Sequence, residues 1–178
     1  TFDGSASEAD AVTFRERTLK LAHSLTLPAP VVLEAPDDEI DPIEAEKGVT
    51  VRVTYDDMRA TDLIKLVLDG ADAFDEVPGS TTGSVDIPVP GAMLSPYVGR
   101  SVKISYIVTR SGNYDASGIL ELTVNDFGEG ELPTPVIPQA QNGVLKLDSF
   151  TGDAEIKVAP WPLIAAGQKV WLRCHATL

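Results

Sequence analysis

The sequence is poor in cysteine, histidine, aromatic residues and positive charge. Cys174 is its one cysteine, so no disulfide can form within the chain in any compartment. Lys and Arg number 14 against 27 Asp and Glu, giving a net charge of -13. Phosphate binding requires a basic face, so this balance argues against nucleic acid as a partner. No apolar run approaches the roughly 18 residues of a membrane helix, and we expect no membrane insertion.

Familiar catalytic motifs are also missing. The sequence contains no Gly-x-Ser-x-Gly, no phosphate-binding loop and no His-Glu-x-x-His. The histidines are His23 and His175, and His175 adjoins Cys174. Adjacent residues of a strand point to opposite faces, which disfavours a shared metal or a nucleophile and base pair. A buried Cys174 beside an exposed His175 is the favoured interpretation. Without a catalytic motif or a catalytic pair, we expect no enzymatic activity, and we expect no cofactor other than a candidate calcium ion.

A proline-rich phrase occurs twice and divides the chain. Leu27-Pro28-Ala29-Pro30-Val31-Val32 returns as Leu132-Pro133-Thr134-Pro135-Val136-Ile137, 105 positions later (132 minus 27). Alternating prolines fix φ and keep the preceding residues extended, which makes a stiff connector. The phrase predicts one complete repeat over 27–131 and the start of another over 132–178.

The second copy follows the first beyond the prolines. At the offset of 105 residues, 51–53 correspond to 156–158 and Met58 corresponds to Leu163. After one inserted residue, Ile64, Leu66 and Leu68 correspond to Val170, Leu172 and Cys174. The later strands of the unit have no counterpart before Leu178, and so few residues do not bury a sandwich core alone.

Alternating apolar and polar residues predict short strands throughout the complete unit. The expected strands cover 31–33, 49–55, 63–68, 85–89, 102–109 and 120–124, with the acidic loop 36–42, a single turn at 90–96 and a hairpin turn at 111–118 between them. Pro88 and Pro90 make 85–89 an edge strand. These short strands, close to the seven of an immunoglobulin-type sandwich, and the lack of a helical period predict an all-β sandwich with Tyr106 in its core. A closed barrel is the alternative, which proline-rich edges disfavour.

The first 26 residues are expected to be a polar lead-in and the closing strand of a preceding repeat. Thr1–Asp10 lack the features of a signal peptide, and the absence of an initial Met suggests a processed protein or an excised piece. Three outcomes are open for 132–178: a truncated, frayed end, a small subdomain, or a composite completed by the strand at 12–26. We favour the composite, which forms within one chain or by strand exchange in a dimer.

These repeats resemble the immunoglobulin-like tandem repeats of large bacterial surface or secreted proteins. The residues that carry the resemblance are Leu27–Pro30, Val49–Tyr55 with Met58, Ile64–Gly70, Val102–Arg110 and Leu120–Val124. The complete unit has neither Cys nor Trp, so the resemblance is to the disulfide-free bacterial kind. The resemblance implies an extracellular or cell-surface location and a role as a spacer or adhesive module. It also implies neighbouring repeats as partners, with a host or cell-surface protein or a glycan as a further partner.

Two groups of residues are candidates for binding. Asp37, Asp38, Glu39 and Asp41 form an acidic loop after the connector, where oxygen ligands suit calcium. A solvated loop is the simpler interpretation, because no EF-hand spacing is present. Trp161 and Trp171 are candidates for a sugar-stacking surface, although a core or interface role is favoured.

We therefore expect a non-enzymatic spacer or adhesion module. The alternative function is a carbohydrate-binding accessory module of a secreted enzyme, which Trp161 and Trp171 would serve.

Overall fold

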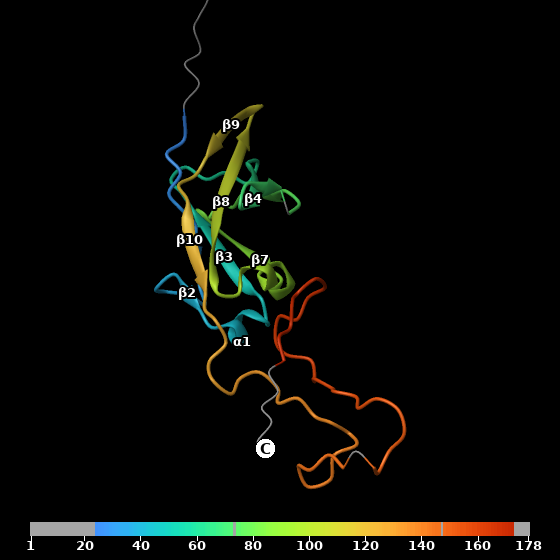
Figure 1. Ribbon diagram of the computed structural model, residues 1–178. Coiled ribbons are helices and arrows are strands. Elements are labelled where there is room, and N and C mark those ends of the chain that lie inside the picture. Colours follow the sequence, from blue (N-terminus) through green and yellow to red (C-terminus); the bar gives the residue numbers. More distant parts are fainter. Residues whose placement is uncertain (1–23, 73, 147, 173–178) are drawn as a thin grey trace, which may run out of the picture.

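The computed structural model describes residues 24–72, 74–146 and 148–172 (Figure 1). Its regular elements all lie between residues 31 and 124. In chain order they are β1 (Val31–Val32), β2 (Glu39–Ile40), α1 (Pro42–Ala45), β3 (Val49–Thr54), β4 (Leu63–Leu68), β5 (Ala71–Asp72), β6 (Val77–Pro78), β7 (Ser84–Val89), η2 (Gly91–Met93), η3 (Ser95–Tyr97), β8 (Arg100–Arg110), β9 (Asn113–Ala116) and β10 (Leu120–Val124).

Two sheets form the predicted all-β sandwich. One sheet has the order β1-β3-β7, and the other has the order β2-β10-β8-β4-β5, with β6 on β4 and β9 on β8. The neighbours β1, β3 and β7 correspond to strands A, B and E of an immunoglobulin-like sandwich, while β4, β8 and β10 correspond to C, F and G. The strand order confirms the fold class.

The core forms where the inner faces of the two sheets meet. Val49, Val51 and Val53 of β3 are buried, while Arg52 and Thr54, which alternate with them, point to solvent. Strands β8 and β10 bury alternate apolar side chains in the same way, including the predicted core residue Tyr106, and β4 buries Ile64, Leu66 and Leu68 together with Val67. This period of two is the pattern of sheets with one buried face.

The predicted edge strand is confirmed. Strand β7 pairs with β3 alone among the described strands and ends its sheet, with Pro88 opposite Thr50. The expected hairpin is only partly right. Residues 113–116 form β9 inside the predicted turn and pair with the end of β8, while β10 pairs with the start of β8.

The acidic stretch 36–42 was expected to be a loop, and that prediction is wrong in two places. Ile40 is 2% exposed, and its burial draws Glu39–Ile40 into β2 beside β10. Asp41 then caps the one-turn helix α1, because its Oδ1 accepts a hydrogen bond from the Ile43 amide at 2.8 Å.

The chain reaches the sandwich at the end that carries β9. Ser24 Oγ and the Leu25 amide donate to the Asp115 carboxylate at 3.1 and 3.2 Å, and the Gly118 amide donates to the Leu27 carbonyl. Most of the expected 12–26 strand, residues 12–23, lies outside the described residues, as do His23, Cys174 and His175.

Residues 125–172, called the tail below, leave the sandwich at its opposite end, beyond β10 (Figure 1). Their described part contains no regular strand, including residues 154–158 and 170–172, which correspond to parts of β3 and β4. The tail instead has two isolated bridges, Val136 with Lys157 and Gln141 with Val144. Isolated strand pairs are marginal without further neighbours.

Across the described ranges, we find no helix with the length and apolar character needed to cross a membrane.

Candidate functional site

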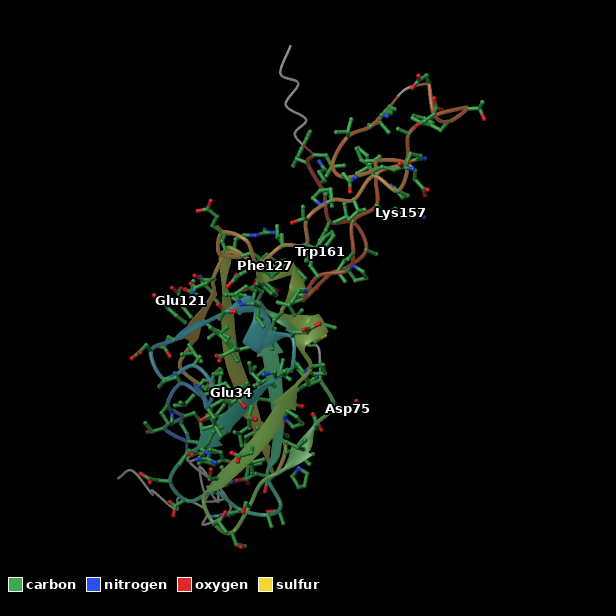
Figure 2. The ribbon with its side chains drawn as sticks, turned by 90° about the horizontal axis from the view of Figure 1, so that it is seen from below. Glu34, Asp75, Glu121, Phe127, Lys157 and Trp161 are labelled. Carbon is green, nitrogen blue, oxygen red and sulfur yellow. The ribbon has the colours of Figure 1, made fainter. Side chains whose placement is uncertain are left out.

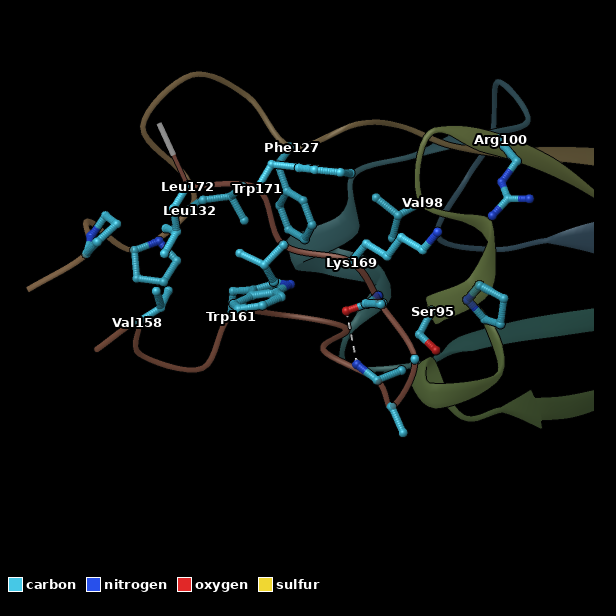
Figure 3. A pocket seen from close by; sticks show the side chains of 18 residues that line it. Ser95, Val98, Arg100, Phe127, Leu132, Val158, Trp161, Lys169, Trp171 and Leu172 are labelled. Atoms are coloured by element: carbon cyan, nitrogen blue, oxygen red, sulfur yellow. Dashed lines mark hydrogen bonds between the residues drawn. The ribbon is translucent and has the colours of Figure 1, made fainter. Parts of the chain in front are cut away.

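A groove of about 840 Å³ lies between the end of the sandwich and the tail. Leu132, Val158 and Trp161 lie on the tail side, while Ser95, Val98 and Arg100 lie on the sandwich side (Figure 3). Arg100 and Lys169 are the two cationic residues of the lining, which contains no Asp or Glu. The groove is therefore largely apolar and faintly basic in a strongly acidic chain.

The tail repeats several hydrogen bonds from the opening of the complete unit. The bridge of Val136 with Lys157 is the counterpart, 105 positions on, of the β1–β3 pair Val31 with Arg52. The repeated proline phrase therefore marks a repeated pairing as well as a repeated sequence.

Two further hydrogen bonds recur at the same offset. The Glu34 carboxylate accepts from the Thr50 amide at 2.7 Å, and the Gln139 side chain accepts from the Glu155 amide at 3.3 Å. The Ala35 amide donates to Val32 at 3.2 Å, and the Ala140 amide donates to Ile137 at 3.0 Å.

The turn after this pairing recurs at an offset of 106. In the complete unit the Asp62 amide donates to the Arg59 carbonyl, and the Arg59 amide donates to the Asp62 carboxylate. In the tail the Gln168 amide donates to the Ala165 carbonyl, and the Ala165 amide donates to Gln168 Oε1. A reciprocal pair of bonds is thus kept although Gln replaces Asp.

Backbone conformation follows the same correspondence. Asp57 has φ of 59° and Leu163, 106 positions later, has φ of 55°. The inserted residue therefore precedes this turn. Its placement after Leu163 was wrong, because the apolar pattern alone aligned Met58 with Leu163 and carried no information on turn geometry.

The side chain that donates to this turn differs between the two copies. In the complete unit Arg110 from β8 donates to both Asp62 carboxylate oxygens at 2.7 and 2.6 Å, and to the Asp57 carbonyl. In the tail Gln168 Nε2 itself donates to the Leu163 carbonyl at 3.1 Å. A neutral amide thus takes over the carbonyl contact that an arginine makes in the complete unit.

Asp62, Arg110 and Tyr55 form a hydrogen-bonded group, called the Asp62 cluster. It contains the most strongly shifted pKa among the described residues, that of Tyr55. Hydrogen bonds from the Arg110 side chain lower the pKa of Asp62 to about 2, although burial of this fully enclosed carboxylate acts the other way. The Tyr55 hydroxyl donates to Asp62 at 2.9 Å, and burial followed by this contact raises the pKa of Tyr55. Sequence inspection missed the cluster, since Asp62 and Arg110 are 48 positions apart. The arrangement is a paired, closed ion cluster that ties β8 to the turn.

Side chains at matching positions differ sharply in burial. Four apolar tail residues have roughly half of their surface exposed, while their counterparts lie in the core. The pairs, with exposed fractions in brackets, are Leu132 (50%) and Leu27 (8%), Ile156 (40%) and Val51 (0%), Val170 (52%) and Ile64 (0%), and Leu172 (48%) and Leu66 (0%).

The two candidate tryptophans occupy different kinds of position. Trp161 matches Tyr55, which is 4% exposed and stacks on Tyr106, so Trp161 sits at a core position of the repeat. Trp171 is 88% exposed and matches Lys65, between the core positions Ile64 and Leu66. Sugar binding by these residues stays a prediction, and Trp171 is the better placed of the two.

The four acids of the predicted calcium loop are spread over different elements. Asp38 has φ of 61° in a turn, Glu39 begins β2, and the Asp41 carboxylate caps α1. Within 24–72, 74–146 and 148–172, no three His, Cys, Asp or Glu side chains form a group able to hold a metal ion. Calcium binding by Asp37 and its neighbours stays a prediction.

No protein-family model matches the chain, and no curated protein matches it. Among solved structures it is similar to a bacterial immunoglobulin-like domain from the ice-binding adhesin of M. primoryensis. The identity is 21%, the coverage is 57% of this chain and 99% of that domain, and the TM-score is 0.38.

A second similar structure is a Ca²⁺-stabilized adhesin with which an Antarctic bacterium reaches out and binds ice. Here the identity is 20% and the TM-score is 0.40, with 67% of this chain covered. The match spans 28% of that adhesin chain.

Proposed function

We propose that this chain is a non-enzymatic, load-bearing spacer segment from a tandem array in an exported bacterial surface or adhesion protein. The observation that carries the proposal is the path of the chain. Residue 24 meets the sandwich beside β9, and the tail leaves from the opposite end, where a second copy of the repeat begins (Figure 1). Units joined in this way extend end to end rather than folding back.

The strand order suits such a unit to tension. Near the start of the unit, β2 runs parallel to β10, the last strand, with Glu39 opposite Thr123. The Thr123 amide donates to the Asp38 carbonyl and the Asn125 amide donates to the Ile40 carbonyl, both at 2.9 Å. Tension applied to the two ends of the unit pulls these parallel strands in opposite directions, so the bonds are loaded together in shear.

The junction with the next repeat is anchored by an apolar contact. Leu163 is 6% exposed and belongs to the same buried cluster as the sandwich core. A leucine at φ of 55° is strained by about 1–2 kcal/mol, a cost that burial of the side chain offsets. This packing supports a junction in which the tail keeps a fixed orientation relative to the sandwich.

The test is single-molecule extension of the full chain from its two ends. We expect one discrete unfolding step for residues 27–124, on the order of 300 Å at about 3.5 Å per residue. Asn125→Pro removes the donor to Ile40 and should lower the unfolding force, whereas Val108→Ala destabilises the β9 end and should change the force less. Extension without a discrete step, or an unchanged force for Asn125→Pro, would contradict the proposal.

A further inference from the structure

Among the described residues, three two-residue turns share one backbone conformation. The two φ values are 47° and 78° at Asp69-Gly70, 51° and 81° at Ser111-Gly112, and 50° and 76° at Asn142-Gly143. Each turn lies between residues that pair with each other, and positive φ at both positions is typical of a type I′ hairpin turn. The turns therefore match in backbone conformation and differ in the side chain at their first position.

The turn in the tail carries the one asparagine of the sequence that a glycine follows, Asn142. The other asparagines, Asn113 and Asn125, are followed by Tyr and Asp. The backbone nitrogen of the next residue can attack the carbon of an asparagine side-chain amide, and a glycine nitrogen is the least hindered because glycine has no Cβ. Asn142 is therefore the asparagine most open to this reaction.

The attacking nitrogen is free in this turn. The Gln141 amide donates to the Val144 carbonyl and the Val144 amide donates to the Gln141 carbonyl, both at 3.0 Å, so the turn closes without the Gly143 amide. Within 24–72, 74–146 and 148–172, that amide has no acceptor, whereas the amide of its counterpart Asp38 donates to the Ala35 carbonyl at 3.0 Å. All four residues of the turn are exposed, so water and base reach it.

The turn at Asp69 and Gly70 provides a contrast within the same molecule. Asp69 Oδ1 accepts a hydrogen bond from the Lys103 amide at 3.0 Å, and the Asp69 amide donates to the Lys103 carbonyl at 2.8 Å. These bonds fix the Asp69 side chain against β8. The Asn142 side chain makes no hydrogen bond with any described residue, so it can turn toward the Gly143 nitrogen.

We propose that Asn142 is a site of spontaneous deamidation through a cyclic succinimide. The Gly143 nitrogen forms a bond to Asn142 Cγ and gives its proton to a solvent base, while the bond from Cγ to Nδ2 breaks and ammonia leaves. Water then opens the ring at one of its two carbonyls and leaves either aspartate or isoaspartate at this position. Water is the only other reactant.

The products change the tail in charge and in backbone length. Deamidation adds a carboxylate where the complete unit already has an acid, Asp37, the counterpart of Asn142. Isoaspartate also routes the main chain through its former side chain, which adds a methylene to the turn and should open the isolated bridge beside it. Figure 2 shows the tail, with Lys157 and Trp161, apart from the strands of the sandwich, so the core should be unaffected.

The experiment incubates the full chain at neutral and at mildly alkaline pH and follows the products by peptide mass spectrometry. Cleavage after glutamate places Asn113, Asn125 and Asn142 in three different peptides. We expect the Asn142 peptide to exchange its amide NH₂ for OH, faster at alkaline pH because the attacking nitrogen must lose its proton. The other two peptides should keep their amides. Labelling by an isoaspartyl methyltransferase identifies the isoaspartate.

Two variants test the chemistry, and a third tests the role of the turn. Gly143→Ala should slow the reaction severalfold, and Asn142→Gln should abolish it because the longer side chain cannot form the five-membered ring. Asp69→Asn creates a second Asn-Gly turn whose side chain Lys103 holds, and we expect it to react more slowly than Asn142.

A free peptide of residues 139–146 provides the reference rate. The proposal is overturned if Asn142 keeps its amide in the full chain after this peptide has reacted, or if Gly143→Ala fails to slow the loss. A reaction at position 69 in the Asp69→Asn variant as fast as that at Asn142 would also contradict it, because the hydrogen bonds of the two turns would then make no difference.

Discussion

The complete unit and the tail share a bridge and a turn with its hydrogen bonds, but they differ in burial. The Arg59 and Asp62 turn recurs at Ala165 and Gln168, with both hydrogen bonds kept. Leu66 has no exposed surface, whereas its counterpart Leu172 is 48% exposed. The difference teaches that turns and caps form from nearby residues, while strands require neighbours that other parts of a chain must supply.

The largest contrast is expected from truncating the matched leucines. Leu66→Ala opens a cavity in the core and should lower the free energy of unfolding by about 3 kcal/mol. Leu172→Ala, at the matching position, should change it by less than about 0.5 kcal/mol because the side chain is already half solvated. Urea unfolding followed by far-UV circular dichroism measures both. Equal losses would show that the tail packs as tightly as the unit.

A smaller contrast is expected from the turn acid. The usual pKa of the Asp62 carboxyl is 3.8 and its folded pKa is about 2, so the folded state favours the ionised form. Its contribution is fully present above about pH 4 and is lost as the pH falls through 2. The pairing is worth roughly 2 kcal/mol.

The substitution Asp62→Asn tests this contribution of the ionised carboxylate. The variant should be about 2 kcal/mol less stable than the native chain at pH 7, and the difference should shrink between pH 4 and pH 2. Gln168, its counterpart, cannot titrate, so Gln168→Glu serves as the control for a charge placed in the tail. A stability difference that stays constant down to pH 2 would refute the ion-pair account.

The smallest expected contrast concerns calcium. The loop Asp37–Asp41 is acidic, whereas its counterpart Asn142–Lys146 contains no acid. The calcium hypothesis predicts that a chelator lowers the stability of the unit by about 1 kcal/mol, or its Tm by about 5 °C. Asp37→Asn combined with Glu39→Gln, which leaves the cap Asp41 intact, should remove the effect. An unchanged Tm would eliminate this site.

The sequence predicts most of the sandwich, because the strongest patterns belong to its longest strands. Val49 to Val53 and Val102 to Val108 alternate over enough residues to fix both the strand and its buried face. Strands β2, β5 and β6 have two residues each and no periodicity to detect. Their positions are determined by the strands they join.

The candidate site was less accessible to sequence inspection. The offset of 105 predicted a second copy, but the apolar pattern alone misplaced its inserted residue, since Leu163 matches Met58 in burial and Asp57 in backbone conformation. The Asp62 and Arg110 pair joins elements that only the fold brings together. The described tail lacks the strands that correspond to β3 and β4, because strand pairing depends on residues that are distant in the sequence.

The most direct test of the central claim is urea unfolding of the full chain followed by two signals at once. Far-UV circular dichroism reports chiefly on the sandwich, and tryptophan emission reports on Trp161 and Trp171 in the tail. We expect a cooperative transition in circular dichroism and a broad emission change that is complete at lower urea. Coincident transitions would contradict the account, because they would mean that the tail is already part of one cooperative unit.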